Sequence, residues 1–305
     1  MNEGKDIILN LILNITGYAS YFRNNDSGRI SGITTCTELG IIVAPVYTFL
    51  YLITHEKIYK KRVIILIVIA FIRSLIFAER LAFIELVVPS FVIYCYFGKL
   101  IKKKFIQLLP LLGVVILLFM FGSMEYFRSW HHYKEIYDGN IVRFTIDRVF
   151  GYYSVAFNTE AIVIQYDNLK FFPYNELEWL WQLPGFSSLK NDLLGQNNLM
   201  TLLETYGNPE YNNPGGFLVA YRDFGWFGII VQYIIGLLFG LFYKGYLKHS
   251  FILSIWYSIT FLCIIELPRY FFWGNVRAFF VIFGLLIFQM YINKNKSKSY
   301  EGNLH

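Results

Sequence analysis

The chain has 305 residues, of which 56% are hydrophobic, 20% aromatic and 16% charged, and its formal net charge is +6. An ordinary soluble domain carries about 25% charged residues. The composition therefore excludes a disordered segment, a disulfide-rich secreted module and most soluble enzymes. It is typical of an integral membrane protein, and the positive charge has to be located before it indicates a partner.

Apolar segments long enough to cross a membrane recur along the chain. A helix needs about 20 apolar residues to cross roughly 30 Å of hydrocarbon. No segment has the strand-like alternation of an outer-membrane barrel, so we expect helices, whose backbone groups are satisfied internally. One helix from 63 to 98 would be too long for a single crossing, so we expect a break around Phe77–Leu81. The sequence predicts an all-α polytopic membrane protein with about eight transmembrane helices, at 5–22, 33–54, 63–79, 81–98, 105–123, 217–243, 250–267 and 275–292.

Lysines mark alternate connections between these segments. They cluster at 57–61, 99–104, 244–248 and 294–298, while the other short connections contain few. The positive-inside rule places these clusters and both termini in the cytoplasm. The expected organisation is an N-terminal membrane region at 1–123, a long external loop at 124–213, a C-terminal membrane region at 214–292 and a cytoplasmic tail at 293–305.

The external loop differs from the rest of the chain in charge. Residues 124–213 contain 6 basic and 11 acidic residues, so the excess of positive charge belongs to the membrane regions and does not indicate nucleic acid. Loops of this length usually bind or cover a ligand. The stretches 141–157, 160–172 and 191–206 are predicted to be amphipathic helices that pack on the membrane surface.

Arginine is distributed differently from lysine. Ten of the 11 arginines lie in outer loops or outer helix ends, whereas 13 of the 16 lysines lie on the cytoplasmic side. A guanidinium group binds phosphate oxygens in two places and stays charged when partly buried. The segregation predicts an external site for a lipid diphosphate, although arginines at helix ends can also extend to lipid headgroups. The candidate phosphate-binding residues are Arg73, Arg80, Arg222, Arg269 and Arg277.

Acidic residues and a histidine near these arginines are candidates for a general base. Histidine titrates near neutral pH, and a carboxylate can also accept the proton of an attacking hydroxyl. The catalytic candidates are Asp223, Glu79 and His132. The structural alternative is that acids and arginines form ion pairs, namely Arg73–Glu85, Arg269–Glu266 and Arg222–Asp223.

We expect neither a metal nor a cofactor. Cys36, Cys95 and Cys263 all fall inside predicted helices and show no metal-ligand spacing. The adjacent histidines 131 and 132 have no third ligand at a zinc spacing. No phosphate-binding glycine loop is present.

Two stretches of the sequence resemble the core of bacterial O-antigen polymerases of the Wzy type. The first is Arg73–Pro89, with the sequence RSLIFAERLAFIELVVP. The second is the long outer loop followed by Tyr221–Gly228, YRDFGWFG, which leads into a glycine-rich segment with Gly236 and Gly240 spaced for close helix packing. The resemblance covers about residues 15–290, and members of this family commonly have a longer chain with more membrane helices.

The resemblance implies a fold similar to the C-type membrane glycosyltransferases, in the bacterial inner membrane. Such an enzyme transfers the growing glycan from undecaprenyl diphosphate to the terminal sugar of a lipid-linked repeat unit at the periplasmic face, without a metal. The implied partners are undecaprenyl-diphosphate-linked glycans, membrane lipid, a chain-length regulator and a flippase. The arginines would stabilise the leaving diphosphate, and Trp179, Trp181 and Tyr206 would stack on sugars. An O-antigen ligase-like enzyme is the alternative. A flippase or transporter is less favoured because the sequence shows no internal repeat.

Overall fold

The structure, a computed structural model, consists of helices joined by turns and loops. It describes residues 35–76, 80–97, 108, 111–113, 115, 118–119, 121–123, 125–126, 129–166, 171–181, 183, 185–186, 199–207, 213 and 215–301. Within these residues no strand is present beyond one isolated bridge between Gly215 and Tyr270, so the prediction of an all-α fold is confirmed for this part of the chain. The described residues divide into two compact units, one formed by 47–152 and the other by 35–46 together with 153–301.

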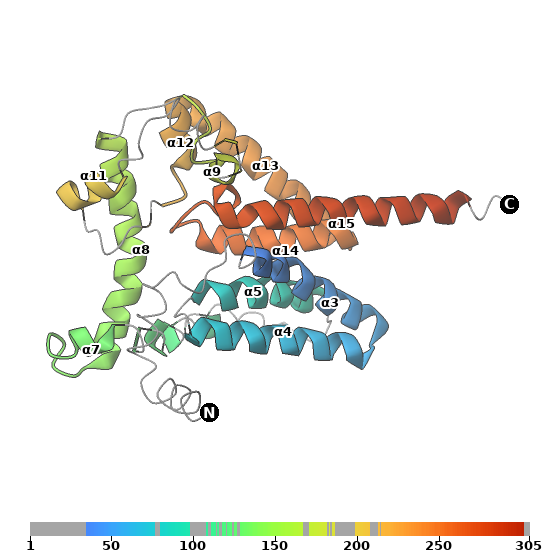
Figure 1. The fold of residues 1–305 in the computed structure, drawn as a ribbon, viewed down its shortest axis with the longest axis horizontal. Helices are drawn as coiled ribbons and strands as arrows, with labels where there is room; N and C mark the ends of the chain where they lie inside the picture. Colours follow the sequence, from blue (N-terminus) through green and yellow to red (C-terminus); the bar gives the residue numbers. More distant parts are fainter. Residues whose placement is uncertain are drawn as a thin grey trace. The chain divides into compact units, whose positions relative to one another are not determined.

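The first unit is built around a helical hairpin. Its helices α4 (Lys57–Ile76) and α5 (Arg80–Phe97) pack against each other (Figure 1). The rings of Phe71 and Phe83 meet edge to face, with their centres 5.4 Å apart. α4 and α5 are thus two separate helices in contact, as expected, whereas residues 77–79 of the predicted break lie outside the described residues. The other helices of this unit are the second half of α3 (Gly40–Thr54), α7 (Trp130–Tyr133) and the first half of α8 (Ile141–Tyr166).

The second unit is built around three long apolar helices. α13 (Gly228–Leu247) and α14 (Phe251–Glu266) form a hairpin whose turn places His249 in the left-handed region, at φ 57°. α15 (Val276–Glu301) packs on the first half of α3 and on η2 (Thr35–Leu39), where Gly284 leaves room for the side chains of Leu39 and Ile42. Shorter elements complete the unit: α9 (Glu178–Trp181), α11 (Leu199–Tyr206), α12 (Val219–Phe224), η3 (Gly225–Phe227) and η4 (Phe272–Gly274).

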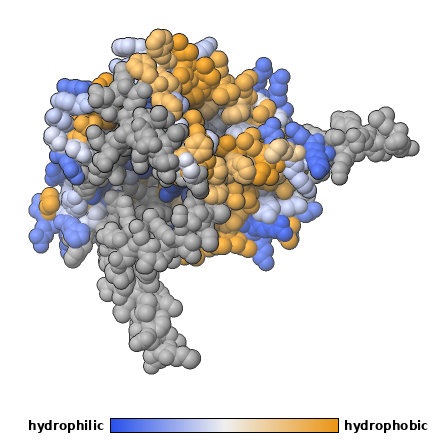
Figure 2. Space-filling view, turned by 45° about the horizontal axis from the view of Figure 1, so that its top comes forward, coloured by the Kyte–Doolittle hydropathy of each residue, from blue (hydrophilic) through white to orange (hydrophobic). Residues whose placement is uncertain are grey.

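Three helical stretches are long and apolar enough to cross a membrane: Thr37–Thr54, Val219–Leu247 and Val276–Lys294. They match three of the eight predicted spans. Most large side chains of α13 face outward, and Figure 2 shows apolar side chains gathered over one face of the molecule, as expected for a surface in contact with lipid. Leu81–Phe97 and Phe251–Glu266 are apolar but shorter. The predicted span 5–22 lies outside the described residues, and the total of eight stays a prediction.

In the long loop, a single helix, α8, replaces the two helices predicted at 141–157 and 160–172. α8 runs without interruption from Ile141 to Tyr166, so the expected break between 157 and 160 is wrong. Neither Gly nor Pro interrupts the sequence there, and Ala156 and Thr159 are buried, so packing carries the helix across this point. Of the predicted segment 191–206, the described part forms the short helix α11.

Candidate functional site

The polar residues of the second unit gather at one end of its long helices. Because α13 and α14 are antiparallel and α15 follows after a short connection, the start of α13, the end of α14 and the start of α15 lie together (Figure 1). We call this the arginine end, because the segments there contain Arg222, Arg269 and Arg277. The opposite ends of the same helices contain Lys244, Lys248 and Lys294. In this unit the arginines and the lysines therefore lie at opposite ends of the same helices.

Asp223 is fully buried at the arginine end and holds a loop in place. Its Oδ2 accepts hydrogen bonds from the backbone N–H groups of Asn175, at 2.6 Å, and Glu176, at 3.0 Å, and its Oδ1 accepts one from Nδ2 of Asn175 at 2.5 Å. The backbone carbonyl of Asp223 accepts a further bond from the N–H of Phe172 at 3.1 Å. These four bonds join residues 172–176 to α12, so the carboxylate acts as an anchor for the loop.

Glu176 is a second buried acid beside this carboxylate. Burial raises the pKa of Glu176 to about 9, and the neighbouring Asp223 carboxylate adds to the shift. Two carboxylates this close in a buried site do not both ionise at neutral pH. Glu176 therefore keeps its proton near pH 7.

Glu160 brings α8 to the same end. Its Oε1 accepts a hydrogen bond from the backbone N–H of Leu218 at 3.1 Å. Burial raises the pKa of Glu160, while the N–H groups of Leu218 and Phe217 and the charge of Arg222 lower it in part. The side chain lies so close to Gly215 that a Cβ there would overlap it, and Gly215 has a left-handed φ of 73°. Glycine is required at this position for both reasons.

Gly215 and Gly216 allow close approach of two backbones. The N–H of Gly215 donates to the carbonyl of Arg269 at 2.9 Å. A Cβ on Gly216 would lie 2.6 Å from the carbonyl oxygen of Leu267. The segment before α12 is thereby pressed against the connection between α14 and α15, which contains Arg269.

The arginines differ in how much of each side chain is open to a ligand. Arg269 Nη1 lies 2.6 Å from Glu266 Oε2, and its side chain is 14% exposed, so the predicted Arg269–Glu266 ion pair is present. Arg277 Nη1 lies 3.9 Å from Glu38 Oε1, and its side chain is 29% exposed. Arg222 is buried and acts electrostatically on Glu160. Arg277 is thus the most accessible of the three.

The remaining predicted site residues belong to the first unit. Arg73 lies half-buried in the last turn of α4, and Glu85 is buried in α5. Arg80 is the first residue of α5, but its side chain and the whole of Glu79 lie outside the described residues. His132 is exposed in the short helix α7. Since α4 ends at Ile76, Arg73 and Arg80 belong to different helices and do not share one helical face.

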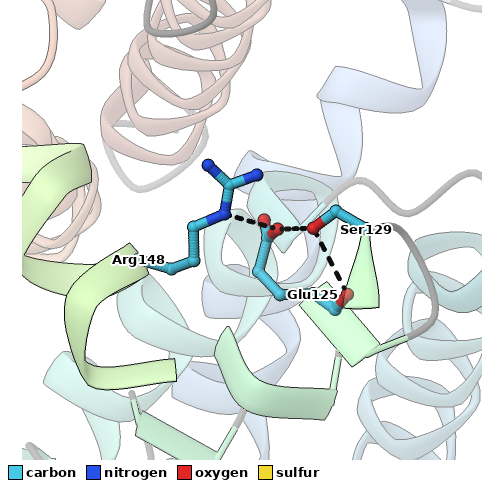
Figure 3. Close-up of polar contacts among 3 residues, drawn as sticks. All are labelled: Glu125, Ser129 and Arg148. Atoms are coloured by element: carbon cyan, nitrogen blue, oxygen red, sulfur yellow. Dashed lines mark hydrogen bonds and ion pairs between the residues drawn. The ribbon is translucent and has the colours of Figure 1, made fainter. Parts of the chain in front are cut away.

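The first unit also contains a buried charged cluster that the sequence did not reveal. Glu125 Oε2 accepts a hydrogen bond from Ser129 Oγ at 2.5 Å and lies 3.6 Å from Arg148 Nε (Figure 3). The guanidinium of Arg148 lies 4.5 Å from the centre of the Tyr133 ring and 5.6 Å from that of Phe144. The signal that could have identified it is the aromatic run from Trp130 to Phe144, because buried cations pack on aromatic faces.

The aromatic residues predicted to stack on sugars lie in different surroundings. Trp181 is buried against Phe172, so its expected role in stacking on a sugar is wrong. Trp179 is half-buried and packs near Phe279. Tyr206 is exposed and stacks on Tyr166 with ring centres 4.0 Å apart. Among the described residues, no group of three or more His, Cys, Asp or Glu could hold a metal ion.

Comparison with known proteins leaves the family open. No protein-family model matches the chain, and neither the curated proteins nor the solved structures contain a match. The geometry of the arginine end and the sequence are therefore the basis on which a function is proposed.

Proposed function

We propose that this chain is a membrane glycosyltransferase that polymerises lipid-linked oligosaccharide repeat units at the external face of a bacterial inner membrane. The observation that carries the proposal is the arrangement of Arg222, Arg269 and Arg277 at one end of the apolar helices, with lysines at the other. By the positive-inside rule the lysine ends face the cytoplasm. The arginine end then faces outward, where a glycan attached to undecaprenyl diphosphate would be joined to the next repeat unit.

The chemistry of the transfer requires fixed positive charge. When the glycan leaves undecaprenyl diphosphate, negative charge develops on the bridging phosphate oxygen, and preorganised donors stabilise it most effectively. Arg277 is open enough to contact the phosphate. Arg269 is held by Glu266, and Arg222 is buried, so these two contribute mainly through the local field. No metal enters this scheme.

A general base has to accept the proton of the acceptor hydroxyl. Asp223 is fully buried, and its two carboxylate oxygens accept three hydrogen bonds, which favours an anchoring role over that of a general base. His132 and Glu79 stay the other candidates for the base that the sequence offers. A chain-length regulator and a flippase are the proposed partners of the enzyme.

Deletion of the gene in its own host tests the proposal. We expect lipopolysaccharide that ends after a single repeat unit, with full-length chains restored by the wild-type gene. A core that carries no repeat unit at all would instead indicate the ligase, which uses the same donor and a different acceptor. Unchanged lipopolysaccharide would contradict both assignments.

Substitution of Arg277 tests the role of the arginine end. In proteoliposomes that contain undecaprenyl-diphosphate-linked repeat units, Arg277→Ala should slow chain extension by about a hundredfold, the effect of removing one preorganised donor. Arg277→Lys should recover little of the rate if two-point binding of phosphate matters. Arg143→Ala, an exposed arginine of α8, is the matched control and should extend chains normally. Normal extension by Arg277→Ala would contradict phosphate binding at this end.

A further inference from the structure

A basic cavity lies at the turn between α3 and α4, at the end opposite Arg73. It has a volume of about 400 Å³, within the range of small-molecule sites. Four of its seven lining residues are basic: His55, Lys57, Lys60 and Lys61. The rest comes from Tyr51 and from Ile64 and Ile65, one turn further along α4. The cavity is distinct from the arginine end, and all of its residues belong to the first unit.

The turn itself is tightly constructed. α3 ends at Thr54 and α4 begins at Lys57, with His55 in the left-handed region at φ 56°. The N–H of His55 donates to the carbonyl of Tyr51 at 2.9 Å, and the N–H of Glu56 donates to Thr54 Oγ1 at 3.3 Å. The backbone of the turn is therefore held by local hydrogen bonds in the free protein.

The cations of this turn fall into two kinds. Arg62 has a structural role, because its Nη1 donates to the Tyr47 hydroxyl at 3.3 Å and its guanidinium lies 5.2 Å from the centre of that ring. Lys57, Lys60 and Lys61 are exposed, and within the described part of the chain none of them has an ion pair or a side-chain hydrogen bond. Glu56 lies on the same turn but does not line the cavity. The cavity therefore presents three uncompensated ammonium groups.

The apolar part of the lining continues along the same face of α4. Residues 57, 60, 61, 64 and 65 follow the spacing of one helical face, and Ile64 and Ile65 are exposed. Lys60 and Ile64 are about 6 Å apart along the helix axis, at 1.5 Å per residue. A single molecule can therefore place an anionic group against the lysines and a hydrocarbon chain against the isoleucines.

We propose that this cavity binds one anionic phospholipid, with its phosphate against Lys57, Lys60 and Lys61 and an acyl chain along Ile64 and Ile65. The lysines lie on the side of the membrane where anionic lipids are enriched. The first turn of α4 adds the positive end of a helix dipole. Charge complementarity and the adjoining apolar wall together favour a lipid over a soluble phosphate compound.

Binding of phosphatidylglycerol to the purified full-length chain tests this site. Native mass spectrometry in detergent should find one dioleoylphosphatidylglycerol retained per chain, in preference to phosphatidylethanolamine. The double substitution Lys60→Gln/Lys61→Gln should weaken the affinity about 30-fold, since each lysine near an anionic lipid contributes roughly fivefold. The control Lys244→Gln/Lys248→Gln removes the same charge from another exposed turn and should leave the affinity unchanged.

Two further measurements distinguish a lipid site from a site for inorganic phosphate and from diffuse attraction to a basic surface. Ile64→Asn/Ile65→Asn should weaken dioleoylphosphatidylglycerol and leave the binding of inorganic phosphate as it is in the wild type. Equal losses in both lysine pairs would show diffuse attraction to the whole surface and overturn the site. Inorganic phosphate that binds as tightly as the lipid would overturn the lipid assignment. If size-exclusion chromatography shows that the lysine pair misfolds, the single change Lys57→Gln, with an expected loss of about fivefold, gives the same decision.

Discussion

Two of the buried acids in the described part of the chain, Glu125 and Asp223, are stabilised in different ways. In the first unit, Glu125 is paired with side chains, the hydroxyl of Ser129 and the guanidinium of Arg148. In the second unit, Asp223 is bound by backbone N–H groups and one amide of a distant loop. In the first arrangement the positive guanidinium of Arg148 balances the charge of Glu125. In the second, the dipoles of N–H groups are directed at Asp223, and the nearby Glu176 is protonated. The comparison suggests that the first cluster fixes side chains and the second fixes the path of the backbone.

Removal of the Asp223 carboxylate should have the largest effect. Asp223→Ala leaves three donors, one buried and two part-buried, without their acceptor, and we expect a loss of about 4 kcal/mol in the free energy of unfolding. Denaturant titration in detergent micelles measures it. Asp147→Ala, at an exposed position of α8, is the control and should stay within about 0.5 kcal/mol of the wild type. A small loss for Asp223→Ala would show that the loop is held by other contacts.

Neutralisation of Glu125 should cost somewhat less. Glu125→Gln preserves the shape but leaves the buried cation of Arg148 without its counter-charge, with an expected loss of about 3 kcal/mol. A double-mutant cycle with Arg148→Met, measured by the same titration, isolates the coupling between the two residues. Additive losses would contradict charge compensation in this cluster, since the two groups would then be independent.

A change in backbone packing should distinguish the clusters directly. A Cβ on Gly274 would lie 2.5 Å from the carbonyl oxygen of Asn175, in the loop that binds Asp223, so Gly274→Ala should cost about 2 kcal/mol. The corresponding change in the first unit is Gly122→Ala, whose Cβ would meet the side chain of Thr145 at 3.1 Å and which should be nearly neutral. Thermal unfolding followed by tryptophan fluorescence compares them. Equal losses of stability in Gly274→Ala and Gly122→Ala would contradict the view that backbone packing matters more around Asp223 than around Glu125.

A further effect should appear as a dependence of the unfolding temperature on pH. Because the pKa of Glu176 is raised in the folded state to about 9, the folded protein binds this proton more tightly than the unfolded chain does. The resulting stabilisation is complete below the ordinary pKa of a glutamate and is lost as the pH rises through about 9. Glu176→Gln, which mimics the protonated acid, should flatten the fall in unfolding temperature between neutral and alkaline pH.

The control for the pH experiment is Glu204→Gln, at an exposed position of α11 in the same unit. This variant should keep the pH dependence of the wild type. An unchanged profile for Glu176→Gln would show that the proton is held elsewhere.

Local sequence features predicted the helices well because length and hydropathy decide them. The apolar runs at 33–54, 217–243 and 275–292 correspond to Thr37–Thr54, Val219–Leu247 and Val276–Lys294. The break after α4 followed from length alone. The amphipathic segments of the long loop were harder, and α8 crosses the expected boundary near residue 158 because buried contacts extend it. Helix boundaries inside a loop depend on what the helix packs against, which is not a local property.

The candidate site could be predicted in part. The sequence identified the Arg269–Glu266 pair, three residues apart on one turn. It did not identify the partners of Asp223, because Asn175 and Glu176 bind it mainly through backbone groups that every residue possesses. Gly236 and Gly240 were expected to allow helix packing, yet among the described residues nothing lies within 4 Å of a Cβ placed on either.

The sequence by itself determined that this is a helical membrane protein whose arginines and lysines are separated. Composition, the length of apolar runs and the positions of charges are local quantities that follow from the hydrophobic effect and the cost of charge in lipid. The tertiary structure alone decided that Asp223 anchors a loop 48 residues away, that Glu176 keeps its proton and that three lysines share a cavity. These properties depend on distances across the fold, because hydrogen bonds and desolvation act over a few ångströms in space, whatever the separation along the chain.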